Sequence, residues 1–235
     1  YMAAEVVGGV LANSLALLAD AGHMLSDAAS LGLALFAIWI ARRPRTASHT
    51  FGFHRTEILA ALVNGVTLVV IAVFIVREAW QRFQAPPEVD GPLMAAVATG
   101  GLVVNLAGLI ILHGGRSESL NVRGAWLHVL ADTLGSVQAI AAGALIWAFG
   151  WRWVDPLASL LIAALVVWSS WALLSEAVNV LLEGVPGHLD TRDIEAAMLE
   201  VDGVAEVHDL HVWTITSGFV ALSAHVVPDA DAPDD

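Results

Sequence analysis

The sequence predicts an all-α membrane protein, a six-transmembrane-helix bundle followed by a short cytosolic α/β domain. Of its 235 residues, 57% are hydrophobic and 14% are charged, and the mean hydropathy is +0.73. Because soluble domains carry about 25% charged residues, this composition excludes a disordered chain and argues against a soluble globular one. Since one helical crossing of a bilayer needs about 20 apolar residues, the chain has room for six spans.

Breaks that contain Arg, Pro or Gly divide the membrane part of the sequence into apolar segments. These expected spans are Met2–Leu18, a second that ends at Ala41, Ile58–Phe83, Leu93–Leu112, a fifth within Leu120–Phe149, and Pro156–Leu182. The first is short for a span, and the chain begins at Tyr1, so we expect a fragment without its natural start. The expected domains are residues 1–184 in the membrane and 188–235 in the cytosol.

Charge and cysteine content narrow the function classes. The net charge is −13, the acidic residues gather after His188, and Arg192 is the sole base there. An acidic surface is unsuited to nucleic acid, so no nucleic-acid partner is expected. The chain has no cysteine, so a metal site must use His, Asp, Glu or backbone oxygen.

The distribution of arginine predicts the orientation in the membrane. Arginines are more frequent in the loops after the second and fourth spans than on the opposite side, which favours cytoplasmic 2–3 and 4–5 loops and cytoplasmic termini. The first set is Arg42, Arg43, Arg45, Arg55, Arg116 and Arg123, and the second is Arg77, Arg82 and Arg152. The absence of lysine and the abundance of Ala, Gly and Arg indicate a bacterial cytoplasmic membrane.

The tail predicts one helix and a hairpin. A helix is expected after His188–Asp190, and alternating residues predict strands at Val204–Ile215 and Phe219–Val227, joined by a turn at Thr216–Gly218. In a regular strand His208 and His211, three residues apart, face opposite sides. Such a small unit is marginal alone, so either more chain follows it or it docks on a partner.

Two apolar runs are too short to cross a bilayer unless their helices include ionisable residues. The second span is apolar from Ala28 to Ala41, so its helix must extend back through Asp27 and His23. The fifth is apolar over Ala139–Phe149, so it must include Asp132 and His128. Each helix then carries one imidazole and one carboxylate on one face, because residues i and i+4 are neighbours.

Two such helices face to face would offer two nitrogens and two oxygens, a donor set that suits tetrahedral Zn²⁺. Two carboxylates also neutralise one divalent cation. Ionisable groups at mid-bilayer cost about 2.5–3.5 kcal/mol each, so we interpret His23, Asp27, His128 and Asp132 as an intramembrane metal site. Hydrogen bonding between helices and a proton relay without metal are the alternatives.

Four segments carry a resemblance to a known family: 14–27 (SLALLADAGHMLSD), 51–57 (FGFHRTE), 128–132 (HVLAD) and 208–213 (HDLHVW). They resemble the cation diffusion facilitator family over nearly the whole chain. The resemblance implies export of divalent metals, mostly zinc, usually in exchange for protons, by homodimers with six helices per subunit. It also implies a ferredoxin-like αββαβ cytosolic domain, of which this chain contains αββ, and it associates the His23–Asp27–His128–Asp132 quartet with a preference for zinc.

The resemblance implies further metal ligands outside the membrane. His49 and His54 lie in the 2–3 loop, where the family can bind another metal, although two solvated loop histidines are the simpler interpretation. His208 and His225 match positions that hold metal in the cytosolic domains of some members, and the alternative is ordinary polar strand residues. Within helices, Asp155-Pro156 predicts a helix cap, whereas Glu5 receives no assignment.

These observations predict Zn²⁺/H⁺ antiport from the cytoplasm, with zinc as transported substrate and as a candidate ligand of the cytosolic domain. The same fold exporting Cd, Co, Fe or Mn is the nearest alternative, because N/O ligand sets select weakly among these metals. A metal-sensing membrane scaffold without flux is another. An enzyme is not expected, since the sequence has no HExxH, diiron or GxSxG pattern and a four-ligand site leaves no position for an activated water.

Overall fold

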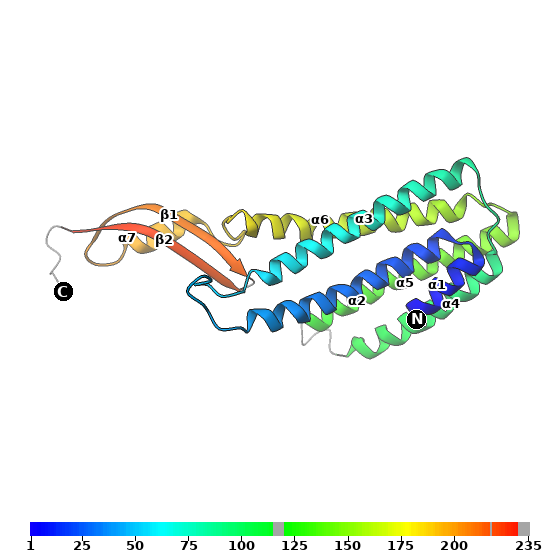
Figure 1. Ribbon diagram of the computed structural model, residues 1–235, viewed down its shortest axis with the longest axis horizontal. Helices are drawn as coiled ribbons and strands as arrows, with labels where there is room; N and C mark the ends of the chain where they lie inside the picture. Colours follow the sequence, from blue (N-terminus) through cyan, green and yellow to red (C-terminus); the bar gives the residue numbers. More distant parts are fainter. Residues whose placement is uncertain (115–119, 217, 230–235) are drawn as a thin grey trace. The chain divides into compact units, whose positions relative to one another are not determined.

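The computed structural model describes residues 1–114, 120–216 and 218–229, so Arg116 and Ser217 lie outside the described residues. The chain is mostly helical and ends in an antiparallel hairpin (Figure 1). Its elements are α1 (Met2–Ala12), α2 (Leu15–Ala41), α3 (Thr56–Gln84), α4 (Gly91–His113), α5 (Leu120–Phe149), α6 (Val154–Leu181), α7 (Thr191–Leu199), β1 (Val204–Thr216) and β2 (Phe219–Pro228).

Five helices, α2 to α6, are long and apolar enough to cross a bilayer. The expected first span, Met2–Leu18, is wrong as a single helix. Helix α1 ends after 11 residues because Asn13 adopts a left-handed conformation, with φ 53°, and its N–H bonds to the carbonyls of Gly9 and Val10. Helix α2 then begins at Leu15. The described part of the chain therefore has five candidate spans and one shorter apolar helix.

The chain divides into two compact units, each described separately below. The first comprises residues 1–29 and 66–170, and the second comprises residues 30–65 and 171–235. In the first unit, small residues let helices approach closely. A Cβ added at Gly91 of α4 would lie 2.5 Å from the carbonyl oxygen of Gly143 on α5, so these two helices meet backbone to backbone.

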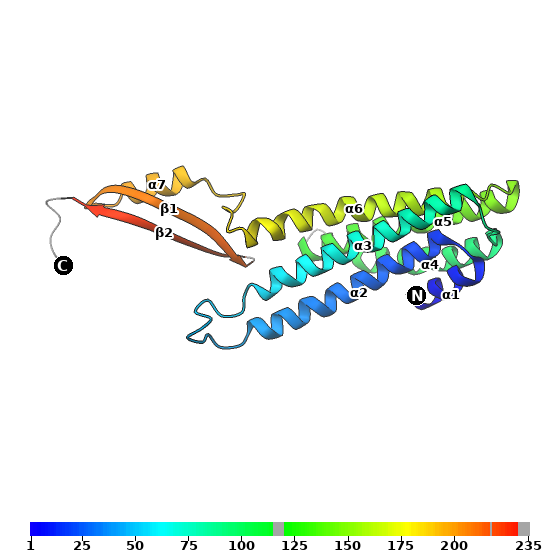
Figure 2. The same ribbon diagram turned by 45° about the horizontal axis from the view of Figure 1, so that its top comes forward.

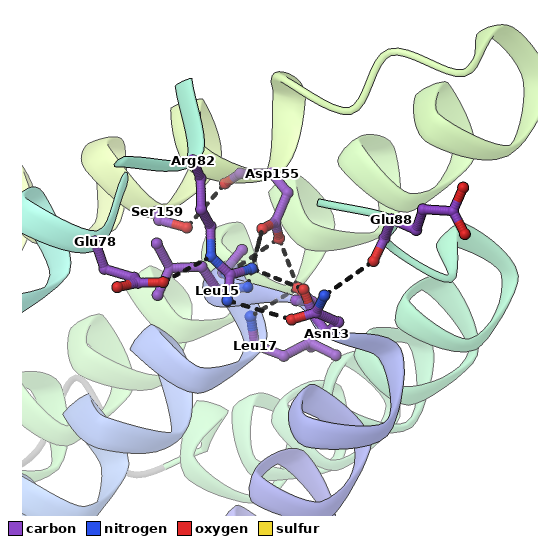
Figure 3. Close-up of polar contacts among 10 residues, drawn as sticks. Asn13, Leu15, Leu17, Glu78, Arg82, Glu88, Asp155 and Ser159 are labelled. Carbon is purple, nitrogen blue, oxygen red and sulfur yellow. Dashed lines mark hydrogen bonds and ion pairs between the residues drawn. The ribbon is translucent and has the colours of Figure 1, made fainter. Parts of the chain in front are cut away.

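Asp155 forms the helix cap that the sequence predicts, and the helix that it caps is α2. It lies in the first turn of α6, fully buried, and its carboxylate accepts a hydrogen bond from the Ser14 hydroxyl at 2.7 Å. It also accepts one from the Leu15 amide at 2.9 Å (Figure 3). The Ala16 amide donates to it at 3.2 Å, and the guanidinium of Arg82 lies 3.5 Å away. One carboxylate thus accepts from two of the amides at the start of α2 that lack a partner within the helix.

In the second unit, the beginning of α3 packs on the end of α6. Ile58 is buried against Ala177 and Val180. Arg55 pairs with Glu183 at 2.9 Å, and the Thr216 hydroxyl at the end of β1 donates to Glu57 at 2.5 Å. Both views show α7 lying along the hairpin (Figure 2), where Asp190 caps α7 by accepting from the Arg192 amide.

A bulge in β1 overturns the expected direction of His211. His208 pairs with His225, and His211 pairs with Ser223, so three residues of β1 oppose two of β2. The extra residue is Asp209, which has φ 52°. Because Ser223 and His225 are two residues apart, His208 and His211 share one face of the hairpin rather than opposite faces.

Candidate metal centre

The helices extend through the ionisable residues as the short apolar runs predicted. Helix α2 is continuous from Leu15, so His23 and Asp27 lie one turn apart within it. Helix α5 is continuous from Leu120, which places His128 and Asp132 in the same relation. Both pairs belong to the first compact unit, and each presents an imidazole and a carboxylate on one helix face.

The two helices bring these four residues together. The Oδ2 atom of Asp27 lies 3.5 Å from Nε2 of His23 on its own helix and 3.4 Å from Nε2 of His128 on the other. Asp132 completes the group, with carboxylate oxygens 3.6 Å from Nε2 of His128 and 4.0 Å from Nε2 of His23. The two imidazole centroids are 6.0 Å apart.

Ligand atoms of His23, Asp27 and His128 all lie within 4.8 Å of one another, a separation that one metal ion can bridge. Both Nε2 atoms face the carboxylates, so both histidines would bind through that nitrogen. The side chains of His23 and Asp132 are 21% and 23% exposed, whereas that of His128 is 49% exposed. The four side chains are therefore partly buried, and His128 is the most exposed of them.

A second cluster lies on the hairpin. The rings of His208 and His225 meet edge to face at 5.2 Å, and Nδ1 of His225 is 3.6 Å from Asp209. Ligand atoms of these three residues lie within 4.8 Å of one another, and all three side chains are exposed. The sequence singled out His208 and His225 but missed Asp209, which reaches His225 from the bulged position.

The loop histidines are arranged differently. His49 stacks on Phe53 at 4.6 Å, and its Nδ1 lies 3.0 Å from the Ser48 hydroxyl. His54 contacts the Phe219 ring edge to face. Within the described residues, neither belongs to a group of three gathered metal ligands. Both line a cavity of about 1060 Å³ in the second unit, together with His211.

Comparison with known proteins identifies the family to which this chain belongs. A family model described as the cation efflux transmembrane domain matches residues 1–182, and one described as the cation efflux protein cytoplasmic domain matches residues 186–234. The chain therefore belongs to the cation efflux family. This is the cation diffusion facilitator family that the sequence motifs resemble. It is an integral, multi-pass membrane protein of a transporter family.

Several curated relatives match almost the whole chain. A "Cadmium, cobalt and zinc/H(+)-K(+) antiporter" of Bacillus velezensis is 49% identical over 97% of this chain and 73% of the relative. The "Zinc transporter ZitB" of Escherichia coli is 48% identical over 98% of the chain and 75% of the relative. The "Metal cation efflux system protein CzcD" of Cupriavidus metallidurans is 47% identical over 97% and 72%.

Proposed function

We propose that this protein exports Zn²⁺ from the cytoplasm in exchange for protons, through a tetrahedral site formed by His23, Asp27, His128 and Asp132. The observation that carries the proposal is the position of Asp27, whose Oδ2 atom lies within 3.5 Å of an imidazole on each of two helices. Two imidazoles and two carboxylates give the donor number that Zn²⁺ prefers and cancel its charge.

The charge of the bound zinc couples its transport to the movement of protons. Zinc binds neutral imidazole and ionised carboxylate, so loading the site expels protons from it. When zinc leaves, two carboxylates and no cation remain in a low-dielectric setting, where protonation is favoured. A site that opens alternately to the two sides of the membrane then carries zinc one way and protons the other.

The same proposal covers the arrangement of the chain. It places six membrane helices, with α1 as the first, in a membrane domain of residues 1–184. A ferredoxin-like cytosolic domain of residues 188–235 follows. Both termini then lie in the cytoplasm, and two copies of the chain form a homodimer. The cytoplasmic-domain match supports the assignment of the tail, and the arginine-bearing loops support the orientation. His208 and His225, joined by Asp209, are proposed as a cytosolic zinc site, and His49 and His54 as accessory ligands of the 2–3 loop.

Other cations are the second candidate. The printed name of the Bacillus relative includes cadmium and cobalt beside zinc. Since N/O ligands discriminate weakly among such ions, competition between zinc, cadmium and cobalt in one flux assay decides the substrate range.

Flux into proteoliposomes, followed with zinc- and pH-sensitive dyes, tests the proposal. Asp27→Ala and Asp132→Ala should each abolish zinc movement and the accompanying proton movement. Asp202→Ala, which removes an exposed carboxylate outside the membrane helices, should leave both unchanged. Normal flux in either membrane variant would refute the quartet, and zinc binding without flux in the wild type would favour a sensing scaffold.

A further inference from the structure

A buried carboxyl group outside the quartet lies on α1. Glu5 is 2% exposed, and its Oε2 atom has no hydrogen-bond partner among the described residues. Its other oxygen lies against α4, where a Cβ added at Gly101 would be 3.1 Å from Oε1. An acidic side chain within the helices of a membrane protein is costly, so its position calls for a functional explanation.

Glu5 lies next to the helix face that carries the quartet. Along α5, His128, Asp132 and Ser136 follow one another at intervals of four residues and therefore share one face. The same Cβ at Gly101 would lie 3.3 Å from the Ser136 hydroxyl, so the Ser136 and Glu5 side chains both lie against Gly101 of α4. Ser136 is buried and accepts a hydrogen bond from Asn105 at 3.2 Å. Glu5 is thus about one helical turn beyond Asp132, toward the end of α5.

The surroundings of Glu5 fit a proton better than a metal. One carboxylate beside a hydroxyl provides too few ligands for zinc. Two carboxylates act electrostatically on Glu5, those of Asp20 on α2 and Asp132 on α5, and the Tyr1 ring lies beside Glu5 at Gly101. On α4, the described neighbours of Glu5 carry no charge. The Glu5 carboxyl group is buried near two other carboxylates, and its Oε2 atom has no hydrogen-bond partner among the described residues, so a proton is the cation that neutralises it most readily.

We propose that Glu5 is a proton-binding site separate from the metal ligands, which gives up its proton when zinc occupies the quartet and regains it when zinc leaves. This inference rests on the proposed Zn²⁺/H⁺ exchange. Zinc adds two positive charges about one turn away and so favours the ionised form of Glu5. The O–H bond breaks, its electron pair stays on the carboxylate, and the proton passes to water on the side to which the site is open.

The number of protons released per zinc bound tests the proposal. Purified protein in weakly buffered detergent solution is titrated with zinc, a pH indicator counts protons, and calorimetry measures zinc affinity in parallel. Glu5→Gln should release fewer protons, by up to about one per zinc, and should still bind zinc at the quartet. Glu195→Gln, which neutralises an exposed carboxylate on α7, should match the wild type.

The outcomes separate this inference from the proposed function. Equal proton release by Glu5→Gln and the wild type, when the wild type does release protons, overturns the role of Glu5 alone. A wild type that binds zinc without releasing protons overturns both. If Glu5→Gln does not fold, the zinc-induced infrared difference spectrum of the wild type replaces it. Loss of a protonated-carboxyl band that Glu5→Asp shifts supports the proposal, and the absence of such a band refutes it.

Discussion

The protein gathers the same ligand types, histidine and aspartate, in two different ways. The helical cluster consists of His23, Asp27, His128 and Asp132, and the exposed fractions of these four side chains lie between 21% and 49%. In the hairpin cluster, His225 is 70% and Asp209 is 67% exposed. The helical cluster joins residues about a hundred positions apart. In the hairpin cluster, Asp209 follows His208 directly in the chain, and His208 pairs with His225 across the two strands.

This difference has consequences for chemistry. Partly buried charges interact through a lower effective dielectric, so we expect binding of a cation to the helical cluster to be coupled strongly to protonation. Exposed charges are screened within about 8 Å at physiological salt, so the hairpin cluster should respond to ionic strength and exchange its ligands with water. The first arrangement suits coupled transport, and the second suits reversible binding.

The largest expected effect comes from removing the shared ligand of the helical cluster. Removing a residue that only hydrogen-bonds to a metal ligand typically lowers metal affinity about 10- to 100-fold. Asp27→Asn removes a charged ligand itself, so it should weaken zinc binding to the helical cluster by more than about 100-fold. Zinc flux should disappear with it. Calorimetry and proteoliposome flux measure the two effects.

The matching change on the hairpin should affect zinc binding more than flux. His208→Ala combined with His225→Ala should remove the weaker zinc-binding event and leave flux through the helical cluster measurable. If flux is lost in the hairpin variant and retained in Asp27→Asn, the assignment of roles to the two clusters is reversed.

The next effect concerns the support of the helical cluster. Asp155→Ala removes the buried partner of Arg82, Ser14 and two amides at the start of α2, and should destabilise the protein by about 3 kcal/mol or more. Asp90 caps α4 by accepting from the Leu93 amide, but it is exposed, so Asp90→Ala should cost about 1 kcal/mol. Unfolding in detergent by heat compares the variants, and equal losses would show that burial of the Asp155 cap is unimportant.

Local patterns predicted the helical cluster because its geometry repeats within each helix. The spacing of His23 from Asp27 fixes a shared face, and the short apolar runs required both helices to extend through their ionisable residues. The boundaries of α3, α4 and α6 also followed closely from the apolar segments and their Pro- and Gly-containing ends.

Tertiary contacts and backbone conformation were harder to predict. An Asp followed by Pro indicates a helix cap, but the neighbouring sequence does not show that Asp155 caps the start of α2, 140 residues away. The turn after Ala12 depends on one left-handed Asn inside an apolar run. The bulge at Asp209 likewise inserts one residue without any glycine or proline to mark it.

A moderate effect is expected from the bulged residue. Asp209 has φ 52°, a conformation that Asn tolerates and Ala disfavours. Asp209→Asn should therefore keep the bulge, remove one charged ligand and weaken zinc binding to the hairpin by about tenfold, measured in an Asp27→Asn background. Asp209→Ala should weaken it further because the backbone shifts as well. Affinities unchanged by Asp209→Asn would remove Asp209 from the cluster.

The smallest expected effect tests the bulge itself through His211. Because the bulge places His211 on the same face as His208, His211→Glu adds a negative charge near the hairpin cluster. Its attraction for a divalent cation should strengthen zinc binding about two- to threefold at low salt and fade as salt is added. His211→Gln, which adds no charge, separates this effect from loss of the imidazole. An affinity that does not change with His211→Glu at low salt would put residue 211 on the opposite face, as in a regular strand, and would remove the bulge that brings Asp209 to His225.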